Sequence, residues 1–308
     1  MSRPAIAVAP SGSDALTRAI ESGGGALSEP ERADGLVWTD PASPGALVEL
    51  LGRCPARWVQ LPFAGIEAFF AAGAIDPART WTCAKGIYGP ACAEHALALM
   101  LAAARRLKVH AQARSWVQPG LGSSERRLHG LTAVIVGTGG IGAALARLLE
   151  PLSVRVLGVN RSGRPLAGAE ATVTVERLDE VLPEADFVVV AAALTAQTRA
   201  LFDAARLARM KPDAWLVNVA RGGLVVTDDL VEALRAGTLG GAALDVTDPE
   251  PLPDGHPLWE LDNALITPHI ANTWDMALPE LIALVERNVA RFAAGEPLEG
   301  LVDPALGY

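Results

Sequence analysis

The sequence contains little of what secreted, metal-binding or membrane-embedded proteins need. Its three cysteines, Cys54, Cys83 and Cys92, form neither a metal-ligand spacing nor an even set for disulfides, so we expect core or loop residues. The amino-terminal residues lack the apolar stretch of a secretory signal, and the longest strongly apolar run, residues 96–104, is too short to cross a bilayer. We therefore expect a cytoplasmic protein with no membrane partner and no bound metal ion.

Positive charge is also scarce. The chain has 26 Lys and Arg residues against 35 Asp and Glu residues, and its formal net charge of −9 argues against nucleic acid as a partner. A small site can still be locally basic, so this charge does not exclude an anionic substrate. Half of the 308 residues are hydrophobic, which is enough for a sizeable core in one large domain or two ordinary ones.

Short apolar runs alternate with helical stretches in the first third of the chain, and this βα pattern predicts a parallel sheet. A long helix over residues 91–107 follows, and it is apolar on most faces, which predicts burial between domains or in a subunit interface. Residues 116–129 are typical of a loop or linker. The expected strands are residues 5–9, 36–38, 58–61 and 81–83, with helices over 14–21 and 65–72.

A second alternating series begins after the linker, so we expect an α/β protein with two Rossmann-like, doubly wound parallel-sheet domains and a cleft between them. A last amphipathic helix over residues 276–293 has room to return to the first domain. The expected strands of the second series are residues 133–136, 154–159, 187–191, 214–219, 241–246 and 264–266, with helices over 139–150 and 227–236.

The first strand of the second series runs into the glycine-rich turn GTGGIG and then into a helix. Gly137 would make the tight turn, Gly139 would let the backbone approach a pyrophosphate, and Gly142 would let the helix pack on the strand. The helix N-terminus offers unpaired N–H groups to phosphates. A flexible turn is the alternative, but the flanking strand and helix favour a dinucleotide site. Its expected residues are Gly137, Gly139, Gly140, Ile141 and Gly142.

The next strand ends where NAD-binding folds usually carry an Asp or Glu for the ribose 2′-OH. Asn160 stands there instead, and Arg161, Ser162 and Arg164 follow it. Arginine and serine would bind a 2′-phosphate through charge-assisted hydrogen bonds, whereas a carboxylate would repel it. We therefore predict that NADP is preferred over NAD. The alternative is that the two arginines are ordinary surface charges.

Three further strand ends would deliver Arg221, Glu250 and His269 to one crevice, because ligands bind outside the carboxyl ends of parallel strands. In this arrangement His269 exchanges a proton with a ketone oxygen, Glu250 fixes the imidazole tautomer, and Arg221 holds a carboxylate. Of the five histidines only His269 leaves a strand at the predicted cleft, whereas His95 lies in the long apolar helix. The set predicts hydride transfer to a 2-keto acid.

The chain resembles the D-isomer-specific 2-hydroxyacid dehydrogenases, through HGLTAVIVGTGGIG, MKPDAWLVNVARGGLV, GAALDVTDPEPLP and NALITPHIANT. The resemblance assigns substrate anchoring to Arg221, histidine orientation to Glu250 and acid–base chemistry to His269. It implies that Asp245 contacts the nicotinamide carboxamide and that the long helix builds a homodimer. It also implies a substrate loop at Phe63, Ala64 and Gly65. We further expect cofactor contacts at Val219, Ala220 and Ala271.

The resemblance implies a discontinuous substrate-binding domain, residues 1–95 and 275–308, and a dinucleotide-binding domain, residues 96–274. The loop at residues 160–164 is similar to that of NADP-using glyoxylate/hydroxypyruvate reductases, so a small anionic 2-keto or 2-hydroxy acid is expected. Val226, Asn272 and Trp274 depart from the residues usual in the family. Poorly matched N-terminal loops leave the particular keto acid open.

Two other functions fit the same scaffold. One is formate or phosphite oxidation; formate enzymes carry Gln in place of Glu250, which argues against formate but not against phosphite. The other is an NAD(H)-sensing, corepressor-like binding protein, since such relatives can retain the Arg, Glu and His set.

Overall fold

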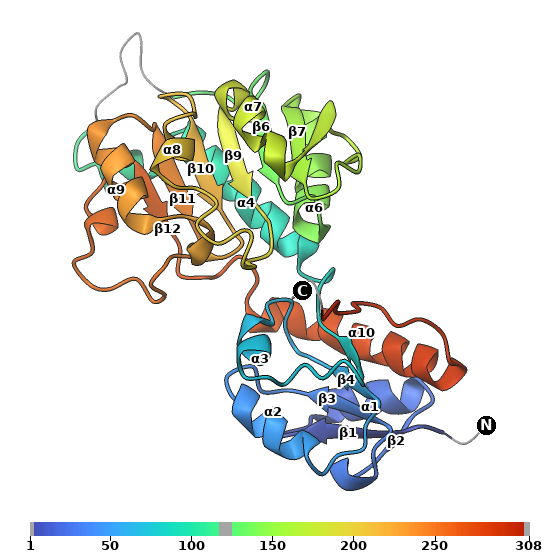
Figure 1. The fold of residues 1–308 in the computed structure, drawn as a ribbon. Helices are drawn as coiled ribbons and strands as arrows, with labels where there is room; N and C mark the ends of the chain where they lie inside the picture. Colours follow the sequence, from blue (N-terminus) through green and yellow to red (C-terminus); the bar gives the residue numbers. More distant parts are fainter. Residues whose placement is uncertain (1–2, 117–124, 305–308) are drawn as a thin grey trace. The chain divides into compact units, whose positions relative to one another are not determined.

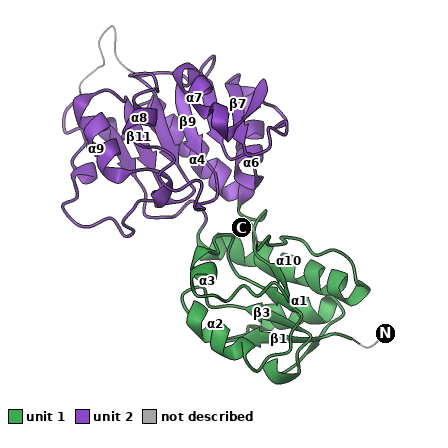
Figure 2. Ribbon diagram, viewed as in Figure 1, with its two compact units in different colours: residues 1–88, 273–308 green, residues 89–272 purple. Residues whose placement is uncertain are grey.

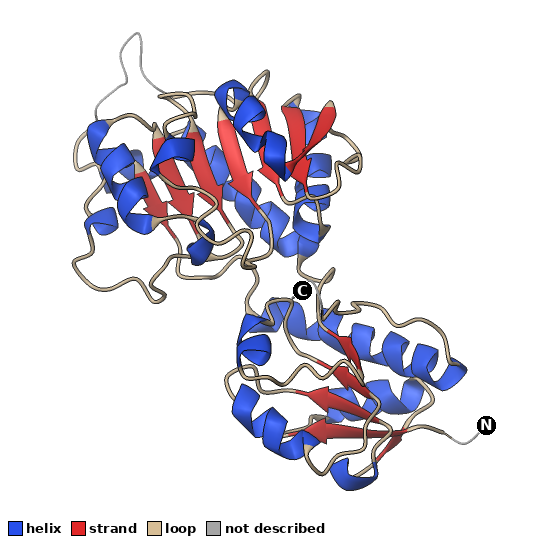
Figure 3. Cartoon of the chain, viewed as in Figure 1, coloured by secondary structure: helices blue, strands red, loops and turns tan. Residues whose placement is uncertain are grey.

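The structure of the protein is a computed structural model that describes residues 3–116 and 125–304. The chain forms two compact units, residues 1–88 with 273–308 and residues 89–272 (Figure 2). Each unit contains one parallel sheet with helices packed against it (Figure 3). This arrangement confirms the predicted α/β class with two parallel-sheet domains. Within the described ranges, no helix is both long and apolar enough to pass through a membrane.

The second unit contains a seven-stranded sheet in the order β12-β11-β10-β9-β6-β7-β8, and all neighbouring strands run parallel. From β6 the chain adds β7 and β8 on one side, and then returns to add β9 to β12 on the other side, so the direction of strand order switches beside β6. Ligands of open α/β sheets bind beyond the carboxyl ends of strands at such a switch point. The strands are β6 (Thr132–Val136), β7 (Arg155–Asn160), β8 (Ala171–Thr174), β9 (Phe187–Val190), β10 (Trp215–Asn218), β11 (Gly241–Leu244) and β12 (Ala264–Ile266).

Helices cover both faces of this sheet (Figure 1). Side chains alternate along β6, so Val134 and Val136 join one core while Ala133 and Ile135 join the other. Burial on both faces explains why the strands are continuous apolar runs. The first core packs on α7 (Leu178–Val181), α8 (Ala204–Leu207) and α9 (Thr227–Ala236), and the second on α4 (Gly89–Ala104) and α6 (Gly140–Leu149).

The first unit is a five-stranded parallel sheet in the order β2-β1-β3-β4-β5. Residues of β1 again separate two cores: Ile6 packs with α1 and α10, whereas Ala7 packs with α2 and α3. The elements are β1 (Ala5–Ala9), α1 (Asp14–Ser22), β2 (Ala26–Leu27), β3 (Gly35–Trp38), α2 (Pro44–Leu51), β4 (Trp58–Gln60), α3 (Glu67–Ala71), β5 (Thr80–Thr82) and α10 (Trp274–Ala294).

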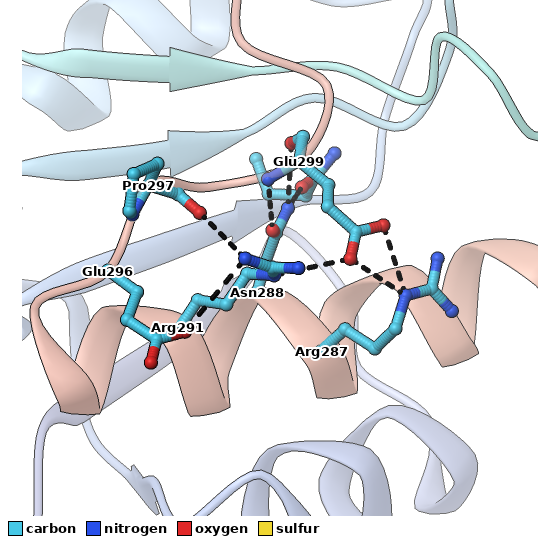
Figure 4. A network of polar contacts seen from close by, with 7 residues as sticks. Arg287, Asn288, Arg291, Glu296, Pro297 and Glu299 are labelled. Atoms are coloured by element: carbon cyan, nitrogen blue, oxygen red, sulfur yellow. Dashed lines mark hydrogen bonds and ion pairs between the residues drawn. The ribbon is translucent and has the colours of Figure 1, made fainter.

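A polar network fastens the carboxyl-terminal segment to the first unit (Figure 4). The fully buried Asn288 on α10 donates to Gln60 Oε1 and to the Glu299 carbonyl, and its Oδ1 accepts from the Glu299 amide at 2.8 Å. Arg287 and Arg291 bind the Glu299 carboxylate. The next residues then pair with β5, where the Cys83 amide donates to the Gly300 carbonyl. The tail therefore belongs to the same unit as the first third of the chain.

Several boundaries differ from the sequence-based predictions. The helix expected over residues 91–107 ends at Ala104, because Arg106 adopts a left-handed backbone (φ 48°) before a separate helix, α5 (Leu107–Gln112). All of α4 packs in the second unit, so that unit starts at residue 89 rather than 96 and ends at 272 rather than 274. Within the linker expected over residues 116–129, positions 117–124 lie outside the described residues.

Candidate functional site

The carboxyl ends of β10, β11 and β12 bring the predicted catalytic residues to one edge of the sheet. These three strands are adjacent and parallel, so the chain leaves each of them at the same edge (Figure 1). Arg221 follows β10, Asp245 directly follows β11, and His269 follows β12. The Glu250 turn continues from β11, which places all four residues in the second unit.

The side chains of His269 and Glu250 are in direct contact. His269 Nδ1 lies 2.5 Å from Glu250 Oε1, and the two side chains are 49% and 40% exposed. A carboxylate only accepts hydrogen bonds, so Nδ1 is the donor and Nε2 is left to exchange a proton. His269 has a left-handed backbone (φ 53°), an uncommon conformation for a residue with a side chain. Its amide donates to the Asp245 carbonyl at 2.8 Å.

Two threonine hydroxyl groups hold the start of the turn that carries Glu250. Thr227 Oγ1 donates to the Asp248 carbonyl at 2.6 Å, and Thr247 Oγ1 donates to the Pro249 carbonyl at 2.8 Å. The Asp248–Pro249 and Glu250–Pro251 peptides are both cis. These two bonds anchor the backbone that leads into Glu250 and so limit where its carboxylate can lie.

The Arg221 turn packs closely on the Glu250 turn. A Cβ on Gly222 would lie 1.9 Å from the Thr247 carbonyl oxygen, so only glycine permits this approach. The buried Asn218 side chain shapes the same turn, because its amide donates to the Arg221 carbonyl at 2.9 Å and its Oδ1 accepts from the Ala220 amide. Arg221 Nη1 donates to the Ala220 carbonyl at 2.6 Å. The segments of Arg221, Glu250 and His269 thus form one packed cluster of turns.

Asp245 is the buried charge of this cluster. Its carboxylate is 2% exposed and accepts hydrogen bonds from Thr267 Oγ1 at 2.6 Å and from the Ile270 and Ala271 amides at 2.9 Å each. His95 Nε2 lies 3.2 Å from its Oδ1. Burial by itself raises the pKa of Asp245, but these four hydrogen bonds outweigh it and hold the pKa at about 2. Asp245 therefore organises the His269 loop, and its predicted contact with a nicotinamide stays a prediction.

We expect the low pKa of Asp245 to make the free energy of unfolding of the second unit depend on pH in the acidic range. Its folded pKa of about 2 lies below the ordinary 3.8, so its stabilisation is present above pH ~4 and is lost as the pH falls through ~2. The shift corresponds to about 2 kcal/mol. Urea unfolding from pH 5 toward 2 should show the difference between wild type and Asp245→Asn shrinking by that amount. The exposed Asp254→Asn is the control, and a pH-independent Asp245→Asn difference would contradict the assignment.

The glycine-rich turn has the geometry of a phosphate-binding site. Gly137 has φ 100°, and a Cβ there would lie 2.5 Å from the Ala191 backbone. A Cβ on Gly142 would lie 2.1 Å from the Gly137 carbonyl oxygen. Gly139 is the N-cap of α6, makes no side-chain cap, and has open space where a Cβ would point. Backbone N–H groups at the start of α6 can thus meet an anion at the switch point of the sheet.

The loop after β7 is held by the Asn160 side chain. Its amide donates to Thr138 Oγ1 and to the Arg164 carbonyl, each at 2.8 Å, and its Oδ1 accepts from the Ser162 amide at 3.0 Å. Asn160 therefore fixes the shape of the loop and ties it to the glycine-rich turn. Arg161 and Arg164 are both exposed on this loop, where an added phosphate could reach them.

The structure shows what surrounds the expected substrate loop and the three residues that depart from the family pattern. In the first unit, the Phe63 ring meets Trp274 edge-on at 5.7 Å and Tyr88 edge-on at 6.3 Å, so Trp274 packs on the expected substrate loop Phe63, Ala64 and Gly65. In the second unit, Val226 is the N-cap of α9 and provides no capping hydrogen bond, which costs about 1 kcal/mol relative to Asp. The Asn272 side-chain oxygen is buried without a hydrogen-bond partner.

The site also contains residues that the sequence did not single out. His95, Thr267, Asn218 and Thr227 hold the turns that carry the predicted catalytic residues. His95 offered a signal, since an ionisable side chain in an apolar helix needs a polar partner. All three cysteines are buried, and burial raises the pKa of the Cys92 thiol to about 11, as expected of a core residue. No metal-binding group of His, Cys, Asp or Glu occurs among residues 3–116 and 125–304.

Comparison with known proteins agrees with the family resemblance of the sequence motifs. Residues 97–271 match the family described as D-isomer specific 2-hydroxyacid dehydrogenase, NAD binding domain. The chain is 44% identical over 257 residues to an uncharacterized protein in the proB 3′ region of Corynebacterium melassecola, covering 82% of this chain and 84% of that protein. It is 38% identical over 214 residues to a glyoxylate reductase of Pyrococcus furiosus, covering 67% of this chain and 63% of that enzyme.

A solved structure of similar fold is the NADPH-dependent glyoxylate/hydroxypyruvate reductase of Sinorhizobium meliloti in complex with NADP and sulfate. Its TM-score is 0.82 at 26% identity, and the match covers 99% of this chain and all of that one. The similarity extends over both units, whereas the family match lies within the second.

Proposed function

This chain belongs to the D-isomer-specific 2-hydroxyacid dehydrogenase family, and we propose that it reduces a small 2-keto acid, with glyoxylate and hydroxypyruvate as the leading candidates. The hydrogen-bonded His269–Glu250 pair carries this proposal, because it provides an oriented imidazole at the carboxyl edge of a parallel sheet. The expected activity also agrees with the names of the Pyrococcus furiosus and Sinorhizobium meliloti relatives.

The side chains divide the chemistry among them. A bound nicotinamide dinucleotide supplies the hydride. His269 donates a proton from Nε2 to the ketone oxygen during reduction and accepts it during oxidation, while Glu250 keeps the proton on Nδ1. Arg221 binds the substrate carboxylate through its planar guanidinium and stabilises negative charge on the reacting oxygen. These roles need no metal ion.

The dinucleotide would lie on the residues at the switch point of the second unit. The turn Gly137–Gly142 fits a pyrophosphate because bulkier residues would close the turn and because α6 begins there without a side-chain cap. Ile141, Val219, Ala220 and Ala271 would contribute further contacts to the dinucleotide. The second unit is thus the proposed dinucleotide-binding domain and the first the proposed substrate-binding domain, with its carboxylate loop at Phe63–Gly65.

The loop after β7 supports NADP as the preferred cofactor. Replacing Arg161 and Arg164 with alanine should lower kcat/KM for NADPH roughly 10- to 100-fold, since each arginine can make a charge-assisted bond to the 2′-phosphate. The value for NADH, which has no such phosphate, should change little. A competition assay that contains both reduced cofactors gives the ratio of kcat/KM for NADPH to kcat/KM for NADH directly. Arg177→Ala, an exposed arginine paired with Glu180, is the control, and equal losses with both cofactors would contradict the preference.

A panel assay tests the proposed reaction. NADPH consumption is followed with glyoxylate, hydroxypyruvate, pyruvate and larger 2-keto acids, and NADP reduction is followed with phosphite and formate. Turnover of a keto acid supports the proposal. Turnover of phosphite alone would contradict the proposal and favour phosphite oxidation. Cofactor binding without any turnover would contradict it and favour the NAD(H)-sensing binding protein.

We also propose a cytoplasmic homodimer that binds neither membranes nor nucleic acid. Large apolar side chains are exposed near the end of α4 and on the following segment: Leu101 is 41%, Leu107 51% and Trp116 97% exposed. Such a surface favours a protein partner, and a second copy would bury it. Three free buried cysteines fit a reducing compartment. Light scattering should give twice the chain mass, and Trp116→Glu should weaken the dimer.

A further inference from the structure

The polar face of α4 provides a histidine that the proposed chemistry does not use. Apart from Cys92, the only ionisable side chains of α4 are Glu94 and His95, and Glu94 is exposed whereas the His95 side chain is only 17% exposed. His95 Nε2 lies 2.9 Å from Thr267 Oγ1 and 3.2 Å from Asp245 Oδ1. One helix of the dinucleotide unit therefore reaches the loop that carries His269.

The donors and acceptors in this group have a defined direction. The Asp245 carboxylate only accepts, and Thr267 donates its hydroxyl hydrogen to Asp245 Oδ1 at 2.6 Å. The Thr267 oxygen can then accept from His95, so Nε2 of His95 carries the hydrogen. His95 thus donates toward both the hydroxyl and the carboxylate, which lie at the adjacent ends of β12 and β11.

The group held by His95 also binds the backbone amides of His269 and of the two residues that follow it. Asp245 Oδ1 and Oδ2 accept from the Ile270 and Ala271 amides, and the Asp245 carbonyl accepts from the His269 amide. His269 sits between these bonds with φ 53°, a backbone conformation that a residue with a Cβ does not prefer. The surrounding contacts must maintain this conformation. Movement of Asp245 or Thr267 would therefore move the imidazole.

We propose that His95 is a positioning residue for the reaction: through Thr267 and Asp245 it holds His269 in the orientation that reaches Glu250 and the substrate. This inference rests on the proposed function of His269. The pKa of Asp245, about 2, supports it because the carboxylate stays charged, and so remains an acceptor, across the pH range of catalysis.

Three substitutions test the role of His95. His95→Leu keeps an apolar volume but removes the donor, and it should lower kcat roughly 10- to 100-fold, with a smaller change in KM for NADPH, because Asp245 is an expected cofactor contact, and in KM for the keto acid. His95→Gln, whose amide can donate from a similar position, should restore most of the kcat. Thr267→Val removes the hydroxyl with little change of shape and should reproduce the kcat loss, which also covers the case in which His95→Leu fails to fold.

A double-mutant comparison shows whether His95 acts through His269. In the His269→Ala background, His95→Leu should have no further effect on kcat, because the group that it positions is gone. Wild-type kcat in both His95→Leu and Thr267→Val would overturn the proposal. So would an equal loss in His95→Gln and His95→Leu, or an additive loss in the double variant.

A spectroscopic measurement separates this inference from the proposed function. The Nδ1 proton of His269, bonded to Glu250, should give a downfield imidazole resonance in the wild type. His95→Leu should broaden or abolish that resonance, whereas His95→Gln should retain it. If the wild type reduces no 2-keto acid but the resonance still responds, the proposed function fails and the positioning stands; if the enzyme is active and the resonance is unchanged, the positioning fails.

Discussion

Replacing His269 with alanine is expected to lower kcat for 2-keto acid reduction roughly 10²- to 10⁴-fold, the range for loss of a positioned general acid. The substitution removes the proton donor and the partner of Glu250 together, but it leaves the glycine-rich turn and the loop after β7 intact. NADPH binding, followed by fluorescence titration, should therefore be preserved. Stopped-flow or steady-state consumption of NADPH across pH measures the loss.

Two further variants make this result specific. Glu250→Gln keeps a hydrogen-bonding group beside Nδ1 but removes the charge, so its loss of kcat should be smaller than that of His269→Ala. His129→Ala replaces an exposed histidine of the same unit and should leave kcat unchanged. A His269→Ala enzyme that retains wild-type kcat would exclude His269 as the acid–base group.

The sequence predicted the sheet of the second unit well because its strands are buried on both faces. Short runs such as Thr132–Val136 and Phe187–Val190 are almost entirely apolar, so their hydrophobicity alone marks them as buried strands. The strand at Ala171–Thr174 was not predicted, because it lies at the edge of the sheet and none of its residues is fully buried. The two-residue strand Ala26–Leu27 is also at an edge and is too short for any periodicity.

The candidate site was predictable where local sequence determines it. A residue that leaves a parallel strand must lie at the carboxyl edge, so the predicted strand ends alone indicated where Arg221 and His269 lie. The contribution of His95 depends instead on how α4 packs across the sheet, 172 residues away in sequence from Thr267. Hydrophobic pattern marks α4 as buried but cannot show which side chain it presents to another segment. A contact between distant segments therefore revealed His95 as a supporting residue, which the sequence alone could not do.

Replacing Arg221 is expected to affect the substrate more than the cofactor. Arg221→Gln should lower kcat/KM for a 2-keto acid roughly 10²- to 10³-fold, because a partner that binds a desolvated carboxylate contributes 2–5 kcal/mol by the usual range. Arg221→Lys keeps the charge but loses the planar pair of donors, so an intermediate loss is expected. An aldehyde without a carboxylate, such as glycolaldehyde, is the diagnostic substrate: its kcat/KM should fall much less than that of glyoxylate. Equal losses on both would instead mean that Arg221 maintains the turn, through its bond to the Ala220 carbonyl, rather than binding the substrate.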